Sequence, residues 1–216
     1  LAPLRLLALE GYEDLKESKI VASLITGEEQ QLSEDAAHIC STIEMLDFDL
    51  EVDVAVIDEV QMLEDNDRGW AWVNAIIGVP AKKVIMTGSV NALEAVKRIV
   101  QYLDEELEVV RHKRKNPLLV LEKWTPLEKL ENGTALIAFS RAEVLKLKQK
   151  LQKKYSVSVI YGNLSPEVRR DEARRFRDGQ SQILIATDAI SMGLNLPIKT
   201  ILFTTDTKFD GVSKRK

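Results

Sequence analysis

Residues 52–61, with the sequence VDVAVIDEVQ, constrain the fold more than any other part of the chain. The first six residues are apolar and mostly β-branched apart from Asp53, which predicts a strand buried on both faces of a parallel sheet. Two carboxylates, Asp58 and Glu59, follow where that strand should end. Open α/β sheets bind their ligands at the carboxyl ends of their strands. The segment therefore predicts an α/β fold with an acidic site at one edge of a sheet.

This acid pair has two interpretations. An Asp at a strand tip can hold the Mg²⁺ of a bound nucleoside triphosphate, and an adjacent Glu can polarise the water that attacks the terminal phosphate. The alternative is a pair of solvated acids that opens a surface loop. The segment alone favours the chemical interpretation, and the other motifs must decide between the two.

Composition excludes several classes of protein. The chain has 216 residues, of which 45% are hydrophobic, so it can bury the cores of one large or two small domains. No stretch approaches the roughly 20 apolar residues of a membrane span, so no membrane partner is expected. The single cysteine, Cys40, excludes an internal disulfide, argues against a disulfide-linked partner and fits a reducing compartment. The net charge of −4 argues against a nonspecific nucleic-acid binder, which is usually basic.

Apolar strands and amphipathic helices alternate in both halves of the chain, a pattern typical of parallel α/β folds. Strands are expected at residues 20–25, 37–41, 52–57, 83–86, 134–139, 157–161, 182–186 and 200–204, and helices at residues 3–17, 70–77, 90–103, 142–154 and 165–177. The pattern restarts between residues 103 and 116. We therefore expect two domains, residues 1–110 and 111–216.

Two tryptophans, Trp70 and Trp72, lie unusually close together in one predicted helix. Their rings could stack on nucleic-acid bases, but helix residues beside a sheet more often belong to the core, and we favour the core for both.

The ordered loop motifs resemble those of the superfamily-two helicase core, in which two tandem RecA-like domains close on ATP and grip one nucleic-acid strand. The resemblance is strongest to the DExH-type ATP-dependent RNA helicases of the mitochondrial RNA-degrading complex and their bacterial relatives. It covers essentially the whole chain. The motifs that carry it are PLRLLA (3–8), TGEE (26–29), STIEM (41–45), DEVQ (58–61), RGWAW (68–72), FS (139–140), YGNL (161–164), ATDA (186–189) and MGLNL (192–196).

The resemblance implies a fold and a set of roles. Each domain should be a mostly parallel sheet flanked by helices. Asp58 and Glu59 would serve Mg²⁺ and the attacking water as catalytic and ATP-binding residues, with Gln61 as the third catalytic residue. Coupling of hydrolysis to domain movement would involve Gln61 together with Thr87, Gly88 and Ser89. Asp188 and Gly193 would approach the ribose end of ATP. Phosphates of the nucleic acid would contact Arg5, Thr26, Gly27, Ser140, Gly162 and Thr187.

Each of these roles has a plainer alternative. Arg5 fits a surface helix residue, residues 87–89 a simple turn, and Ser140 a helix cap; the joint order of the motifs favours the functional roles.

Ser191 departs from the family, whose members usually carry glycine there, and its β-carbon makes that loop less adaptable. In the arginine-rich segment 169–177, the arginines cannot all share one helix face, so some should pair with Glu167, Asp171 and Glu172.

Two family motifs are missing. None of the ten glycines is followed by lysine or arginine, so the chain has neither a Walker A loop nor the Gly-Arg motif that supplies an arginine finger. Both would fall outside residues 1–216. We therefore expect a segment truncated at both ends that hydrolyses ATP poorly by itself, since the finger alone is worth about 10³ to 10⁵ in rate.

The sequence leads to one main functional hypothesis and one alternative. The main hypothesis is a segment of an ATP-dependent RNA helicase that couples ATP hydrolysis to translocation on or unwinding of RNA, with an exoribonuclease as a possible partner. Its compartment would be the mitochondrial matrix or the bacterial cytoplasm. The alternative is a catalytically inert RecA-like module that binds RNA or a nuclease.

Overall fold

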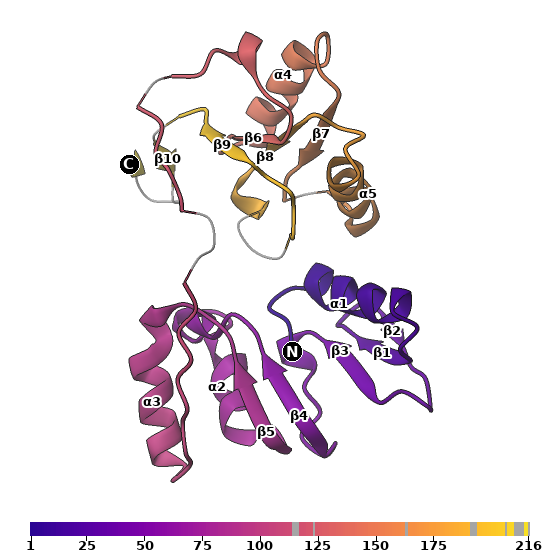
Figure 1. Cartoon of the computed structure of the whole chain (residues 1–216), viewed down its shortest axis with the longest axis vertical. Helices are drawn as coiled ribbons and strands as arrows, with labels where there is room; N and C mark the ends of the chain where they lie inside the picture. The colour runs from indigo at the N-terminus through magenta and orange to yellow at the C-terminus, as the bar shows by residue number, and fades with distance from the viewer. Residues whose placement is uncertain are drawn as a thin grey trace. The chain divides into compact units, whose positions relative to one another are not determined.

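The computed structural model describes residues 1–113, 117–122, 124–162, 164–190, 194–205, 207–209 and 214–215. The chain divides into two units, Leu1–Lys115 and Asn116–Lys216, each built of strands and helices (Figure 1). Unit 1 contains α1 (Arg5–Glu17), β1 (Ala22–Ile25), β2 (Gln30–Gln31), β3 (His38–Ser41), η1 (Ile43–Met45), β4 (Val52–Ile57), η2 (Val60–Glu64), α2 (Gly69–Gly78), β5 (Ala81–Met86), η3 (Val90–Ala92) and α3 (Leu93–Tyr102). Unit 2 contains η4 (Leu127–Lys129), β6 (Thr134–Ile137), α4 (Arg141–Leu151), β7 (Val157–Ile160), α5 (Pro166–Arg177), β8 (Ile183–Ala186), η5 (Asp188–Ile190), β9 (Thr200–Phe203), β10 (Lys208–Phe209) and β11 (Lys214–Arg215).

The strands of unit 1 form two groups, β2-β1-β3 and β4-β5. The pairs β1/β3 and β4/β5 are parallel, and only β2 runs antiparallel to its neighbour. Residues 1 and 2 lie between the groups: Ala2 N–H donates to Ser41 O at 2.8 Å, and Asp58 N–H donates to Leu1 O at 3.1 Å. The chain's first residues therefore link the end of β3 to the end of β4.

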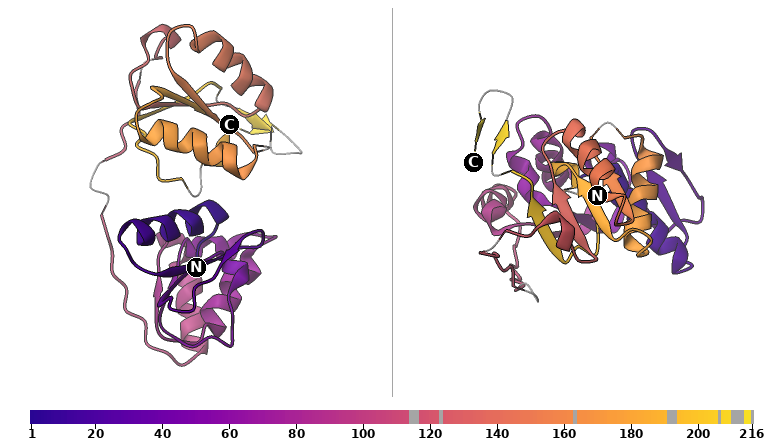
Figure 2. Two further views of the ribbon diagram at one scale, coloured as in Figure 1. Left: turned by 90° about the vertical axis from the view of Figure 1, so that its right-hand side faces the viewer. Right: turned by 90° about the horizontal axis from the view of Figure 1, so that it is seen from above.

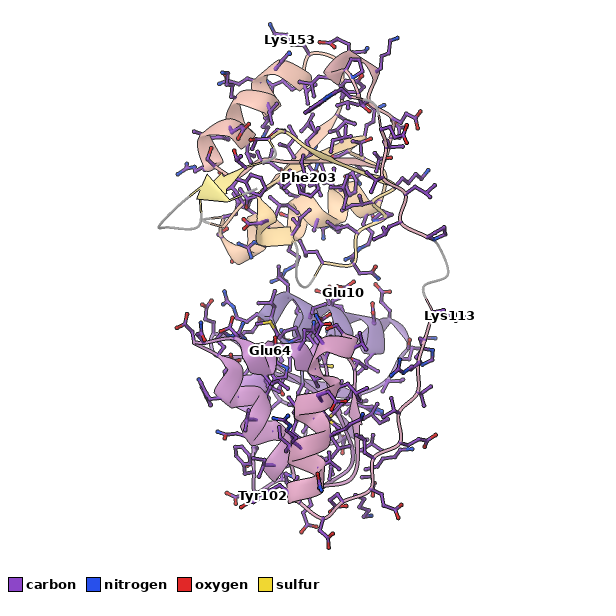
Figure 3. All side chains as sticks on the ribbon, turned by 90° about the vertical axis from the view of Figure 1, so that its left-hand side faces the viewer. Glu10, Glu64, Tyr102, Lys113, Lys153 and Phe203 are labelled. Atoms are coloured by element: carbon purple, nitrogen blue, oxygen red, sulfur yellow. The ribbon has the colours of Figure 1, made fainter. Side chains whose placement is uncertain are left out.

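Helices cover the two strand groups separately. Helix α1 packs on β1 and β3 through a small core that includes Leu9, Tyr12 and Leu24 (Figure 2). Helices α2 and α3 pack on β4 and β5 around the fully buried Trp72 and Ile57. The amphipathic pattern predicted for α3 is confirmed, since Val96 and Val100 are buried while Tyr102, at its carboxyl end, is exposed (Figure 3).

The prediction that β4 is buried on both faces is wrong. Ala55 and Ile57 point into the core, but Val54 and Val56 are 50% and 46% exposed. Strand β5, expected as an apolar strand at residues 83–86, exposes Ile85 in the same way. The reason is that α2 and α3 cover one face of this strand pair, and within the described residues of unit 1 no helix packs on the other.

Two smaller expectations also fail at the level of single residues. Pro3 does not begin the first helix, because α1 starts at Arg5 with the extended Leu4 before it. Of the two tryptophans, only Trp72 belongs to the core; Trp70 is 57% exposed, because positions two residues apart in an α-helix point about 200° apart and so face opposite sides of it.

Unit 2 is a four-stranded parallel sheet in the order β7-β8-β6-β9. Strands β6, β7 and β8 are buried along their whole length, as their largely apolar sequences predict, and this includes the polar Thr134 and Ser158. Helix α4 packs through Val144 and Leu151 on one face, and α5 packs through Ala173 and Phe176 on the other. The short strands β10 and β11 pair with each other.

Helix α5 also protects one edge of this sheet. The carboxylate of Glu172 accepts a hydrogen bond from Val159 N–H in β7 at 3.0 Å. Asp171 and Glu172 pair with Arg174 and Arg175, which confirms the expectation that acids within the segment bind some of its arginines. No helix in the described parts of the chain is long and apolar enough to cross a membrane.

Candidate active site

The carboxyl ends of β4 and β5 bring the segments 58–61 and 87–89 together. Because the two strands are parallel, Asp58 and Thr87 leave the sheet at the same edge. Thr87 N–H donates to Ile57 O at 3.0 Å, and Val60 N–H donates to Thr87 O at 2.8 Å. The hydroxyl of Thr87 donates to Oδ1 of Asp58. The backbone ladder thus continues beyond the strands and aligns the acids with the Thr-Gly-Ser turn.

The backbone turns sharply at Glu59. This residue has a φ of 56° and lies in the left-handed region, which costs a residue with a side chain about 1–2 kcal/mol. Its N–H donates to Oδ1 of Asp58 at 3.0 Å. Oδ1 of Asp58 therefore accepts two hydrogen bonds, which fixes the carboxylate and directs Oδ2 elsewhere. Both acids are half-buried, so they remain accessible to a ligand.

Gln61 connects Glu59 to the opposite turn. Its Nε2 donates to Oε2 of Glu59, and its Oε1 accepts from Ser89 N–H at 3.0 Å. Gly88 makes this approach possible, because a β-carbon there would lie 2.6 Å from Gln61 Oε1 and 3.0 Å from the nitrogen of Val60. The structure therefore brings together all six residues predicted for hydrolysis and coupling in unit 1.

An indole that the sequence interpretation placed only in the core contacts this site. The Nε1–H of Trp72 donates to Asp58 O at 2.9 Å, and the guanidinium of Arg68 lies 5.5 Å from the Trp72 ring centroid. Arg68 in turn binds Glu44 and Pro3 O. The RGWAW motif was recognised in the sequence. Trp72 lies fourteen positions from Asp58, however, so only the fold reveals the contact between them.

The nucleic-acid residues predicted in unit 1 lie at the same edge of the strands. Thr26 follows β1, and Arg5 in the first turn of α1 forms an ion pair with Glu28. The buried hydroxyl of Thr26 donates to Glu29 O at 3.0 Å and accepts from Glu29 N–H at 3.0 Å, so it closes the 26–29 turn. Gly27 is exposed at the tip of that turn, with nothing within 4 Å of where a β-carbon would lie.

In unit 2, Ser140, Gly162 and Thr187 follow β6, β7 and β8 at the carboxyl edge of the sheet. Ser140 caps α4 by accepting from Glu143 N–H at 3.2 Å, as its alternative interpretation predicts. Gly162 is exposed, and Asp188 begins η5 directly after Thr187. Gly193 and Ser191 lie outside the described residues.

Arg169, which the sequence placed in a general arginine-rich segment, has a specific position. Its Nη2 donates to Gly162 O at 2.9 Å and to Tyr161 O at 3.4 Å. The guanidinium of Arg141 lies 5.5 Å from the centroid of the Tyr161 ring. Two arginines from different helices therefore hold the loop that contains Gly162.

The acids of unit 1 fit a nucleotide-bound magnesium ion better than a metal site made of protein ligands alone. Among the described residues, no group of three or more His, Cys, Asp or Glu side chains could hold a metal. Mg²⁺ in nucleotide sites needs only one or two carboxylates, since phosphates and water complete its coordination. Asp58, with one carboxylate oxygen fixed and the other directed away, suits that role.

Solved structures confirm the fold. The helicase Lhr of Mycobacterium smegmatis, bound to single-stranded DNA and AMP-PNP, matches with a TM-score of 0.69 and 15% identity over 94% of this chain and 35% of that one. A point-substituted variant of Dbp5 from Saccharomyces cerevisiae, bound to RNA and ADP BeF3, matches with a TM-score of 0.63 and 16% identity over 93% of this chain and 60% of that one. This likeness shows the fold of the two units, which are RecA-like.

Sequence comparison identifies the family. The family model described as the DEXQ-box helicase domain of Suv3 matches residues 1–112, and the helicase conserved C-terminal domain matches residues 116–214. The chain belongs to the Suv3 family of DEXQ-box helicases. The predicted fold class and the predicted family are thereby confirmed.

Relatives in this family are named as ATP-dependent RNA helicases. The mitochondrial SUV3 helicase of S. cerevisiae is 41% identical over 97% of this chain and 30% of its own length. The mitochondrial DExH16 helicase of Arabidopsis thaliana is 37% identical over 99% of this chain and 38% of its own length. The chain thus spans about a third of the curated relatives it matches. Family membership implies the use of ATP, while the roles of single residues remain predictions.

Proposed function

We propose that this chain is part of an ATP-dependent RNA helicase that couples ATP hydrolysis to translocation on or unwinding of RNA. The observation that carries the proposal is the joined arrangement of Asp58, Glu59 and Gln61 with the 87–89 turn. An acid pair held at the tip of a parallel strand can hold Mg²⁺ and orient the attacking water, which are two of the tasks in phosphoryl transfer to water. The names of the relatives support RNA as the nucleic acid.

Each residue of unit 1 has a stated part in this proposal. Asp58 would hold Mg²⁺, which neutralises charge on the phosphates of ATP when bound. Glu59 would accept a proton from the attacking water, and Gln61 would orient Glu59 through the hydrogen bond between their side chains. Thr87, Gly88 and Ser89 would move with these residues, because hydrogen bonds tie them to Asp58 and Gln61.

Nucleic-acid contacts would come from the carboxyl edges of both sheets. Exposed Gly27 and Gly162 offer backbone N–H groups, which bind phosphates without reading bases. Arg5 would exchange its ion pair with Glu28 for a phosphate. The hydroxyl of Thr26 would shape the turn that presents Gly27, while Ser140 and Thr187 would contact phosphates directly. We assign Asp188 and Gly193 to the ribose end of ATP, and we propose residues 1–110 and 111–216 as the two domains.

Partners and compartment follow from the same relationship. We propose the mitochondrial matrix, since the relatives are named as mitochondrial, and an exoribonuclease as a protein partner in RNA degradation. A bacterial cytoplasmic location stays the alternative. An inert RecA-like module that binds RNA or a nuclease is the competing function, motivated by the absence of Gly-Lys and Gly-Arg pairs in these 216 residues.

The test is RNA-stimulated ATPase activity of the full-length protein with Asp58→Asn and Glu59→Gln variants. We expect each to lower kcat by about 10²-fold or more, as for loss of a general base or of a metal ligand. Asp53→Asn is the matched control, because Asp53 lies on the same strand but is exposed and paired with Lys82. Wild-type turnover in both site variants would reject the catalytic assignment, and a full-length protein without ATPase activity would favour the inert module.

A further inference from the structure

The peptide bond between Asp58 and Glu59 is also held by a residue outside the segment 58–61. The left-handed φ of Glu59 reorients this peptide, and Asp58 O points into the core. There it accepts a hydrogen bond of 2.9 Å from the Nε1–H of Trp72, whose side chain is fully buried. A carbonyl that is partly shielded from water needs a donor, and this one comes from helix α2. Rotation of the peptide would therefore break a partly buried hydrogen bond.

The indole is in turn linked to two other segments through Arg68. The guanidinium lies over the Trp72 ring at 5.5 Å, within the range of a cation–π interaction. Its Nε donates to Oε1 of Glu44 at 2.7 Å, and its Nη2 donates to Pro3 O at 2.6 Å. Both Arg68 and Glu44 are about two-thirds buried, so this ion pair is partly shielded from solvent.

The loop before α2 is built to place Arg68. Oδ1 of Asp65 accepts from the N–H groups of Asp67 and Arg68 at 3.0 and 2.8 Å, which fixes the backbone of the loop. A β-carbon on Gly69 would lie 2.4 Å from Leu63 O, so only glycine permits this entry into the helix. The position of Arg68 is thus set by the backbone and not by its own flexible side chain.

We propose that Trp72 is a positioning residue for the Asp58–Glu59 peptide, and that Arg68 makes this position respond to nucleic acid bound by Arg5, two residues from Pro3. The inference rests on the proposed function. Nucleic acid that moves the start of α1 displaces Pro3 O, which is one of the two groups that Arg68 binds. The guanidinium of Arg68 then moves, and with it the Trp72 indole that it contacts and the hydrogen bond from that indole to Asp58 O.

The first experiment removes the indole donor while retaining the ring. In the full-length helicase, Trp72 is replaced by benzothienylalanine, which has sulfur in place of N–H, and in a second variant by Phe. We expect the benzothienyl variant to lower kcat for ATP about tenfold, the effect of one unmade hydrogen bond, with KM for ATP unchanged and the melting temperature lowered by only a few degrees. Trp70→Phe, in the exposed tryptophan two residues away, is the control and should match the wild type.

The second experiment tests the link to nucleic acid. ATPase rates with and without single-stranded RNA are compared for Arg68→Gln and for Glu44→Gln, which retains an acceptor for Arg68. We expect Arg68→Gln to lower the ratio of stimulated to unstimulated rate about tenfold and Glu44→Gln to lower it less, in protein that melts as the wild type does. Trp70→Phe should keep the wild-type ratio.

The outcomes separate this inference from the proposed function. A benzothienyl variant with wild-type kcat overturns the inference, and so does an Arg68→Gln variant with the wild-type stimulation ratio. Asp58→Asn and Glu59→Gln are measured alongside: if they turn over ATP normally, it is the proposed function that fails. If they are inactive while the Trp72 and Arg68 variants behave as wild type, only the positioning role is rejected.

Discussion

Gly88→Ala should push the segment 58–61 away from the 87–89 turn. The added carbon would lie 2.6 Å from Gln61 Oε1, 2.8 Å from Val60 Cγ2 and 3.0 Å from Val60 N, all shorter than the 3.4 Å at which ordinary contact begins. Gln61 could rotate away only by giving up its bond to Ser89 N–H. Val60 N is backbone that already donates to Thr87 O, so the two turns themselves must separate by a few tenths of an ångström.

Two magnitudes follow from this separation. Overpacking of this kind costs about 1–3 kcal/mol in the free energy of unfolding. A shift of about 1 Å in a catalytic group costs about 10²-fold in rate, so a shift of a few tenths of an ångström should lower kcat for RNA-stimulated ATP hydrolysis by up to about tenfold. The free energy of unfolding is measured by denaturant titration and kcat by steady-state ATPase assays on the full-length helicase.

Gly27→Ala is the matched control for Gly88→Ala. Nothing lies within 4 Å of its β-carbon position and its φ is not positive, so stability should stay unchanged or rise by up to about 1 kcal/mol. If Gly88→Ala keeps both the stability and the kcat of the wild type, the close approach of Gln61 and Val60 to the 87–89 turn is not what positions the acids, and the reasoning fails.

Three further predictions concern separate parts of the chain. Gly69→Ala should destabilise unit 1 by about 1–3 kcal/mol in denaturant titration, because its β-carbon meets backbone atoms of Leu63; unchanged stability would contradict that contact. Ser140→Ala should lower the free energy of unfolding by about 1 kcal/mol, because the helix cap is lost, whereas Ser140→Asn should retain the cap and the stability. If Ser140→Asn nevertheless binds RNA more weakly, that loss reports a contact between the Ser140 hydroxyl and a phosphate. Burial raises the pKa of the Cys40 thiol, so iodoacetamide at pH 8 should alkylate native protein more slowly than protein unfolded in guanidinium; equal rates would contradict this.

The acidic site was predictable because its geometry follows from the fold class. Once residues 52–57 and 83–86 are recognised as neighbouring parallel strands, the residues that follow them must meet at one edge. The adjacency of Asp58 and Thr87 needs nothing more. The family was inferred from the order of the motifs, and the family comparison confirmed that inference.

The rest depended on contacts that no local pattern encodes. The exposure of Val54 and Val56 depends on which face α2 and α3 cover, and a run of β-branched residues looks the same whether one face or two are buried. The bond from Trp72 to Asp58 O depends on how a helix docks, and it was concealed by the correct statement that Trp72 belongs to the core. Likewise, the sequence shows Arg169 only as one of several arginines in a charged segment, whereas the structure shows that it donates to the backbone carbonyl of Gly162.

The left-handed backbone at Glu59 has a consequence for protein engineering. A glycine there would relieve about 1–2 kcal/mol of steric cost, a noticeable share of the roughly 5–15 kcal/mol by which a domain is stable. A screen that selects variants for heat resistance alone would therefore tend to enrich Glu59→Gly and discard the carboxylate proposed to activate water. Selection for thermostability therefore needs to monitor ATP turnover in parallel, because at this position the more stable variant is expected to be catalytically inactive.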